Sequence, residues 1–446
     1  MSSIPFRPRF RLLPLLLALG LGASAQAQSL VDLYTAARGY DASYQSAKAQ
    51  YDANLYFAEQ SRALVLPKVG VTAGYSGSNY ENRPSGAATV DRGYNSQTAS
   101  ISATHPLYRP ADDATYQQSL KAKEKALAAL KSAEQDLIVR LSQAYFDVLA
   151  SADSLTFVKA QKAAVQEQLA SAKRNFEVGT ATITDTREAQ ARFDLVTAQE
   201  IASENDLRVK KLALTTLVGQ QAAQPKPLVE PVALASFVAT DVDAWVSRSQ
   251  TEHPAVQQLR VALDVAQIET RKARAGNLPT LDLEVLYQLS TGSGSVNWPT
   301  NYASNASSIG VNFKMPLFAG YSIQNREKET VSLEEKARDD LEATLRNVAL
   351  GVRTAFYGVE SGLGQVKAYE AAEMSSQSAL DANKLGYQVG VRINIDVLNA
   401  QSQVFDTKAK LSKARYDVLM GSLRLRQASG TLAEADLQPV NALLAK

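Results

Sequence analysis

The sequence predicts a mainly α-helical protein with a small β part, in which one unit of helix, two strands, very long helix and second helix occurs twice. Three observations predict this fold class: a match between the two halves of the chain at a fixed offset, helical patterns longer than a globular domain needs, and four short segments of alternating apolar and polar residues. We therefore expect long α-helical coiled coils joined to a β-sheet.

The repeat appears when the chain is compared with itself. Phe176-Glu177-Val178-Gly179 matches Tyr387-Gln388-Val389-Gly390, 211 positions further on, and Gly219 and Gly430 have the same offset. The sequence therefore predicts four parts after residue 27: a first repeat at 28–222, a linker with three prolines at 223–239, a second repeat at 240–430 and a C-terminal segment at 431–446.

Residues 1–27 have the pattern of a secretory signal peptide. Arg7, Arg9 and Arg11 form a basic start, an apolar run follows, and Ala25-Gln26-Ala27 is a small-x-small cleavage site. The apolar run has about 11 residues, whereas a membrane-spanning helix needs about 20. We expect an exported protein without a spanning helix.

Composition excludes several classes of function. A formal net charge of +2 gives no bulk attraction to nucleic acid. The chain has no cysteine and two histidines, His105 and His253, each followed by proline, which argues against disulfides, thiol catalysis and Cys/His zinc sites. With no phosphate loop, HExxH or GxSxG motif, we expect no enzyme activity, no catalytic residue, no metal and no cofactor.

The long helical patterns occupy corresponding parts of the two repeats. From Pro110 to Asn175 the chain has no internal proline or glycine, and a helix of about 66 residues would be roughly 100 Å long. Apolar residues recur in steps of three and four, which predicts coiled-coil seams. The corresponding seam positions include Leu130, Leu137, Leu141, Tyr145 and Val148 in the first repeat, and Leu341, Val348, Val352, Phe356 and Val359 in the second.

Four segments switch to a period of two: 69–75, 99–105, 281–289 and 309–315. Alternation of this kind is typical of a membrane barrel, whose strands need about 9–11 residues to cross the hydrocarbon. A soluble sheet with one wet face shows the same alternation. The signal peptide favours the membrane, and the Gly/Ser/Asn-rich stretches 77–96 and 290–307 are predicted to be the connecting loops.

Four strands cannot close a barrel, and lipid offers no partner for the backbone groups of an open sheet edge. The chain must therefore associate with further copies. Two copies would give eight strands and three would give twelve.

These features and several motifs resemble the TolC family of trimeric outer-membrane channels. The motifs are Leu278-Pro279-Thr280-Leu281-Asp282-Leu283, Gly386-Tyr387-x-Val389-Gly390-x-Arg392 and Asp396-Val397-Leu398. The resemblance implies a homotrimer with one shared twelve-stranded β-barrel in the outer membrane of a Gram-negative bacterium, and a coiled-coil tunnel in the periplasm. It implies that 223–239 and 431–446 belong to an equatorial belt around the tunnel.

The resemblance also implies a function. The channel would be the passive exit duct of a tripartite efflux pump or a type I secretion system, gated at its periplasmic end. Its partners would be outer-membrane lipid, a periplasmic adaptor (membrane fusion) protein, and an inner-membrane pump or ABC transporter. The alternative is a periplasmic adaptor-like coiled-coil protein, which would need soluble β domains flanking one helical hairpin. The sequence does not identify the cargo.

By the same resemblance, Tyr387 and Arg392 occupy the positions of gating residues, with Thr184 and Asp185 as their partners on the hairpin of the first repeat. Arg415 matches a further arginine of the closed-state network. Simpler structural roles also stay open for two of these residues. Asp185 could only cap a helix, and Arg392 could be a solvated charge in a loop.

An entrance ring is implied as well. Asp396 matches its first aspartate, whereas Asn399 occupies the second position, at which the best-known member of the family has aspartate. A trimer would then carry three formal negative charges at the entrance instead of six. Asp396 could also act only as a helix cap.

Overall fold

The computed structural model describes residues 28–83, 85–86, 88–220, 223–232, 234, 241–294 and 300–445. The predicted signal peptide and part of the predicted linker lie outside these residues. The first repeat contains α1 (Leu30–Tyr40), α2 (Ala42–Arg62), β1 (Lys68–Asn82), β2 (Val90–Tyr108), α3 (Pro110–Glu177) and α4 (Ile183–Val218). The second contains α5 (Val242–Glu252), α6 (Pro254–Ala275), β3 (Thr280–Gly292), β4 (Tyr302–Lys314), α7 (Ser322–Gln388) and α8 (Asn394–Ser429), followed by η2 (Glu434–Asp436) and α9 (Leu437–Asn441).

Each repeat contains, in this order, two shorter helices, two strands, a very long helix and a further helix. The long helices α3 and α7 have 68 and 67 residues. The sequence did not reveal that the first helix of each repeat is broken in two. Asp41 ends α1 and caps α2 by accepting the Tyr44 N–H at 2.8 Å, while Pro254 begins α6 directly after His253.

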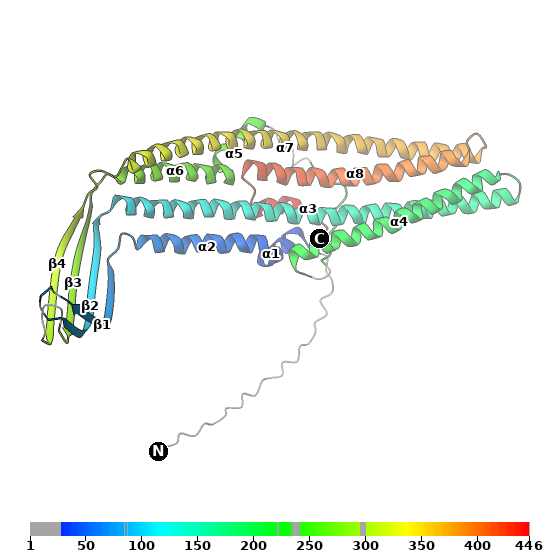
Figure 1. Cartoon of the computed structure of the whole chain (residues 1–446). Coiled ribbons are helices and arrows are strands. Elements are labelled where there is room, and N and C mark those ends of the chain that lie inside the picture. Colours follow the sequence, from blue (N-terminus) through cyan, green and yellow to red (C-terminus); the bar gives the residue numbers. More distant parts are fainter. Residues whose placement is uncertain are drawn as a thin grey trace, which may run out of the picture.

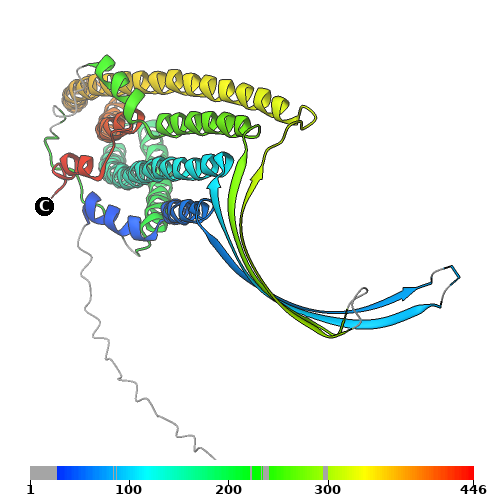
Figure 2. The same ribbon diagram turned by 90° about the vertical axis from the view of Figure 1, so that its left-hand side faces the viewer.

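The helices form one layer that is four columns wide (Figure 1). The helices α3 and α7 run its whole length, whereas α2 and α4, and likewise α6 and α8, lie end to end. α3 contacts α2, α4, α6 and α8, and α7 contacts α6 and α8. Figure 2 shows the columns in the order α7, α6, α3, α2. None of the described helices combines the length and apolar character that a membrane-crossing helix requires.

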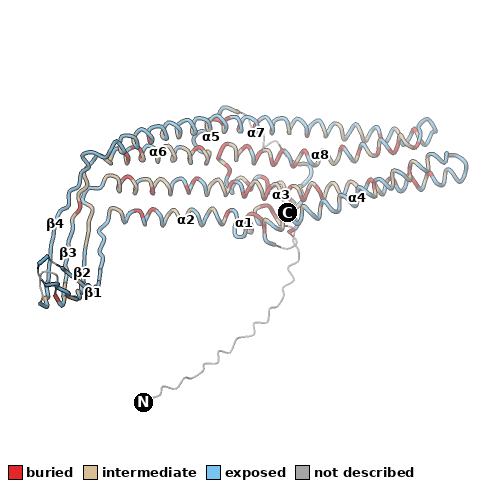
Figure 3. The backbone as a smooth tube through the Cα atoms, viewed as in Figure 1, coloured by how far each residue is buried: buried red, intermediate tan, exposed pale blue. Residues whose placement is uncertain are grey.

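The largest core lies midway along the layer, where parts distant in sequence meet. Buried side chains of α1, α3, α8 and α9 pack together there, among them Tyr34, Leu141, Phe146, Leu419 and Leu437. The hydroxyl of Tyr145 donates to the carbonyl oxygens of Gln28 and Lys226 at 3.3 and 3.0 Å. Elsewhere burial is confined to narrow seams between helices (Figure 3), because each helix has neighbours only on its flanks.

The strands form one antiparallel sheet in the order β1-β2-β3-β4. The predicted loops at 77–96 and 290–307 were wrong in extent. β1 stays paired with β2 as far as Asn82↔Val90, and β3 with β4 as far as Gly292↔Tyr302. Backbone pairing explains the difference: a hairpin can continue past the apolar part of its strands, since the ladder bonds do not depend on side-chain polarity. In Figure 2 the β1–β2 ribbon projects beyond β3 and β4.

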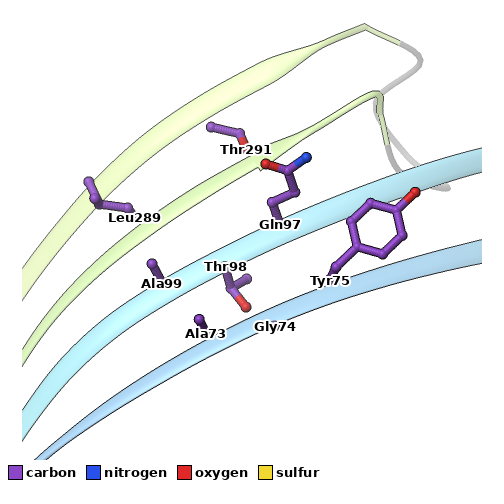
Figure 4. Close-up of a pocket in the computed structure, with 8 residues that line it drawn as sticks. All are labelled: Ala73, Gly74, Tyr75, Gln97, Thr98, Ala99, Leu289 and Thr291. Atoms are coloured by element: carbon purple, nitrogen blue, oxygen red, sulfur yellow. The ribbon is translucent and has the colours of Figure 1, made fainter. Parts of the chain in front are cut away.

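Register places the alternating residues of all four strands in common rows. Ala73, Ala99 and Leu289 lie side by side, and Tyr75, Gln97 and Thr291 form the next row (Figure 4). One face of the sheet therefore carries an apolar band, which ends where the Gln97 row begins. Its other members include Val71, Ile101, Tyr287, Ile309 and Val311. The opposite face is mostly Gly, Ser and Thr.

An ion pair with a buried carboxylate fixes the break between α1 and α2 against α3. The two guanidinium NH groups of Arg140 donate to the two carboxylate oxygens of Asp41 at 2.9 and 3.0 Å, and the Asp41 side chain is only 7% exposed. The hydrogen bonds from Arg140, helped by backbone N–H donors, lower the pKa of Asp41 below its usual range, against the opposing effect of burial.

We expect Asp41→Asn to reduce the stability of the folded protein at pH 7 by about 1.5–3 kcal/mol, the range for a hydrogen bond to a charged group. Because the folded-state pKa of Asp41 lies below its unfolded value, its stabilisation is present above about pH 4 and is lost as the pH falls through the folded-state value. Thermal unfolding of both proteins between pH 7 and pH 3 should show the difference shrinking in acid. Asp52→Asn, at an exposed position of α2, is the control, and an undiminished difference at low pH would contradict the assignment.

Candidate gate at the hairpin ends

The two long hairpins end together, at the end of the layer opposite the sheet (Figure 1). Both turns are built in the same way, because each repeat carries Val-Gly after its long helix. Gly179 and Gly390 have φ values of 79° and 78°, a conformation that glycine adopts without steric cost. The turns span 178–182 and 389–393, and four of the predicted gate residues lie in or beside them: Thr184, Asp185, Tyr387 and Arg392.

Asp185 is a helix cap within the chain. Its carboxylate accepts the Thr182 N–H at 2.9 Å and the Thr182 hydroxyl at 2.7 Å, while Thr182 Oγ1 accepts the Asp185 N–H at 3.2 Å. This is the reciprocal capping box that begins α4. Thr184, which lies between Thr182 and Asp185 in the sequence, is exposed. Asp185 also remains partly exposed.

Arg392 and Asp396 face each other across the turn that begins α8. Arg392 Nη1 lies 3.8 Å from Asp396 Oδ2, and the same oxygen accepts the Ile393 N–H at 3.4 Å. The Arg392 side chain is 58% exposed and that of Asp396 34%. A pair so exposed contributes roughly 0.2–1 kcal/mol.

Tyr387 and Asn399 contact the other hairpin. Asn175 of α3 donates to the Tyr387 hydroxyl at 3.4 Å, and Arg192 of α4 donates to Asn399 Oδ1 at 3.2 Å. Both contacts join the first repeat to the second within one chain. The sequence analysis did not identify either partner.

Asn394 is a further residue that the sequence analysis missed. It is fully buried, its amide donates to the Asp185 carbonyl oxygen at 3.4 Å, and its side-chain oxygen accepts from Gln168 of α3. The repeat contains a signal that could have identified it, since the 211-residue offset pairs Asn394 with the apolar Ile183. A polar residue that replaces an apolar one at a buried helix start needs a hydrogen-bonding partner.

Arg415 does not lie with the other residues. It is 21 positions beyond Asn394 in α8, about 30 Å along the helix, and it pairs with Glu230 and Glu370 at 2.8 and 3.4 Å. At the corresponding positions of the first repeat, Lys159 and Glu204 pair at 2.9 Å with the charges reversed. Arg415 therefore joins α7 and α8 to the segment that follows α4.

The ends of the hairpins also expose apolar side chains. Val178 and Val391 are 73% and 76% exposed, and Ile183, Val389 and Ile393 are exposed as well. An exposed group of apolar residues at the tips of polar helices is typical of a surface that meets another protein.

Comparison with known proteins gives one consistent result. The family model described as "Outer membrane efflux protein" matches residues 33–220 and 245–431, one match for each repeat. The outer membrane protein TolC of Vibrio cholerae is 34% identical over 97% of this chain and 98% of its own length. The alkaline protease secretion protein AprF of Pseudomonas aeruginosa is 32% identical over 95% of this chain and 88% of its own.

The fold is also that of solved outer-membrane channels. The crystal structure of the outer membrane protein VceC from Vibrio cholerae superposes with a TM-score of 0.77, covering 90% of this chain and 96% of that one at 17% identity. The family match, the relatives and the fold agree with the geometry of the sheet and hairpins: the chain belongs to the TolC family of outer membrane efflux proteins.

Proposed function

We propose that the protein is a passive outer-membrane exit duct that carries cargo from the periplasmic end of its tunnel through a shared β-barrel. The observation that carries this proposal is the division of the chain between two ends. A sheet with an apolar band lies at one end of helices of 67 and 68 residues, roughly 100 Å long, and the two hairpin turns lie at the other. No chemical step by this chain is needed, since such a duct only guides what an energised partner delivers.

The working unit in this proposal is a homotrimer. β1 and β4 are the two edges of the sheet, and each needs a partner for its outer backbone groups in lipid. Pairing of β1 with β4 of a neighbouring copy closes twelve strands around one axis. The outer columns of the helical layer, α2/α4 and α7, meet the neighbouring copies in the same way. We place two segments in an equatorial belt: the linker 223–239, which joins the repeats 28–222 and 240–430, and the C-terminal segment 431–446.

The gate in this proposal consists of weak contacts repeated three times. Thr184, Asp185, Tyr387 and Arg392 hold the hairpin ends together, and Asn175, Gln168 and Asn394 support them within each chain. Arg415 supports the gate from a distance by joining α8 to α7. Three exposed ion pairs of this kind sum to about 0.6–3 kcal/mol, which corresponds to a change of roughly 3–150-fold in an open–closed equilibrium. The binding energy of a partner can offset a free-energy difference of that size.

The partners in this proposal are a periplasmic adaptor protein at the hairpin ends and an inner-membrane pump or ABC transporter behind it. The exposed apolar residues at the tips, such as Val178 and Val391, support a protein contact there. The relative AprF is named for the secretion of a protease and the family for efflux, so both kinds of cargo are compatible with the duct.

We expect Arg392→Ser and Tyr387→Phe each to increase single-channel conductance in a planar bilayer, because each removes one contact that holds the hairpin ends closed. The double variant should exceed either single one. Arg346→Ser is the matched control, since Arg346 is an exposed arginine of α7 whose partner, Glu342, is on the same helix. Unchanged conductance in all three gate variants would contradict the gate assignment, and no conductance in any protein would favour an adaptor-like role.

We expect Asp396→Ala to reduce the preference of the channel for cations, because it removes the carboxylate ring at the entrance. Asn399→Asp should have the opposite effect, since it would raise the formal charge of the ring from three to six. Reversal potentials in a salt gradient measure both. If neither substitution moves the reversal potential, the entrance ring does not control ion selectivity.

A further inference from the structure

The two places where the sheet passes into a long helix are built differently. In the first repeat only Arg109 separates β2 from α3. Its guanidinium donates to both carboxylate oxygens of Asp282 in β3, with Nε and Nη2 each 2.6 Å from an oxygen, and the Asp282 side chain is 8% exposed. This junction is fixed by a charged, bidentate contact.

The corresponding junction of the second repeat has neither the arginine nor the aspartate. Pro106 matches Pro316, which puts Ala319 at the position of Arg109, and Pro67 matches Pro279, which puts Gly70 at the position of Asp282. Seven residues without a charge connect β4 to α7 instead. We call this segment the junction loop: Met315-Pro316-Leu317-Phe318-Ala319-Gly320-Tyr321.

The junction loop exposes its large apolar side chains. Leu317 is 93% exposed, the highest value of any large apolar residue in the described chain, while Phe318 and Tyr321 are 74% and 66% exposed. Apolar surface of this extent is unfavourable in water. A partner of apolar chemistry must therefore cover the loop.

The loop is also held in a defined shape. Gly320 and Tyr321 have φ values of 58° and 63°, and Tyr321 is the one non-glycine residue with positive φ among the described residues. Such a conformation is strained for tyrosine. Ser322 stabilises the turn by donating its N–H and its hydroxyl to the Ala319 carbonyl oxygen at 3.1 and 2.8 Å. The rings of Phe318 and Tyr321 meet edge to face at 5.5 Å.

The position of the junction loop beside the sheet indicates which apolar partner covers it. β4 enters the loop directly from the apolar band of the sheet, and Val311, Phe313 and Met315 at alternate positions are 60%, 64% and 46% exposed. The loop thus continues the lipid-facing surface at the edge where the sheet meets the helices. Tyrosine with an adjacent apolar ring is typical of the boundary between hydrocarbon and water.

We propose that the junction loop inserts into the periplasmic leaflet of the outer membrane and anchors each subunit to the phospholipid surface. This rests on the proposed membrane barrel. Each subunit then has one polar junction at Arg109–Asp282 and one lipid anchor at Leu317 and Phe318, so a trimer carries three anchors. The anchor would set the depth of the barrel in the membrane.

The absence of cysteine from the chain allows a direct test with single-cysteine variants. Phe318→Cys and Leu317→Cys report on the loop, Tyr287→Cys reports on the apolar band, and Tyr357→Cys reports on α7 about 50 Å from its start. Each trimer is labelled with a thiol-reactive fluorophore and reconstituted into phosphatidylethanolamine–phosphatidylglycerol vesicles. Nitroxide-labelled lipid is then added as a quencher.

We expect positions 317 and 318 to lose fluorescence to the same degree as position 287, while position 357 keeps it. Quenching at 287 without quenching at 317 and 318 would overturn the anchor and would mean that a neighbouring subunit covers the loop. Absence of quenching at 287 as well would overturn both the anchor and the membrane barrel on which it rests.

Discussion

The architecture depends on one constraint, the need of every backbone N–H and C=O group in hydrocarbon for a hydrogen-bond partner. Four strands pair with one another in the order β1-β2-β3-β4 and leave two edges. Those edges make the isolated chain incomplete, and closure with further copies resolves this at no cost in new types of contact. In the proposed trimer the arrangement of the helices follows from the sheet, because strands that close into a ring continue into helices that must also stand in a ring.

The layer of helices has a consequence for stability. Each helix has neighbours on its flanks only, so burial occurs in narrow seams and in one larger core midway along the helical layer. That core joins the first helix, the segment after α4 and the C-terminal residues, through contacts such as Tyr145 to Gln28 and Lys226. The Asp41–Arg140 ion pair fixes the break between α1 and α2 beside this core.

The two repeats share the same order of helices and strands, but they differ at several positions that make contacts between elements. The pair Lys159–Glu204 of the first repeat corresponds to Glu370–Arg415 of the second, with the charges exchanged. Ile183 corresponds to the buried Asn394, which joins the two hairpins. Arg109 and Asp282 have no counterparts beside the junction loop. Each difference lies at an end of the tunnel or on a seam, where the two repeats face different surroundings.

The sequence by itself determined the features that are periodic or local. The 211-residue offset established the repeat, apolar spacing established the long helices, and period-two alternation established the four strands. Strand ends were misjudged because Gly- and Ser-rich residues give the same local signal in a loop and in a paired ribbon. Only the tertiary structure decided which residues meet across the hairpins: Asn175 with Tyr387, Arg192 with Asn399, and Arg415 with Glu230 far from the tips. The physical reason is that these contacts join residues far apart in the sequence, and their geometry depends on how α3, α7 and α8 pack rather than on any local pattern.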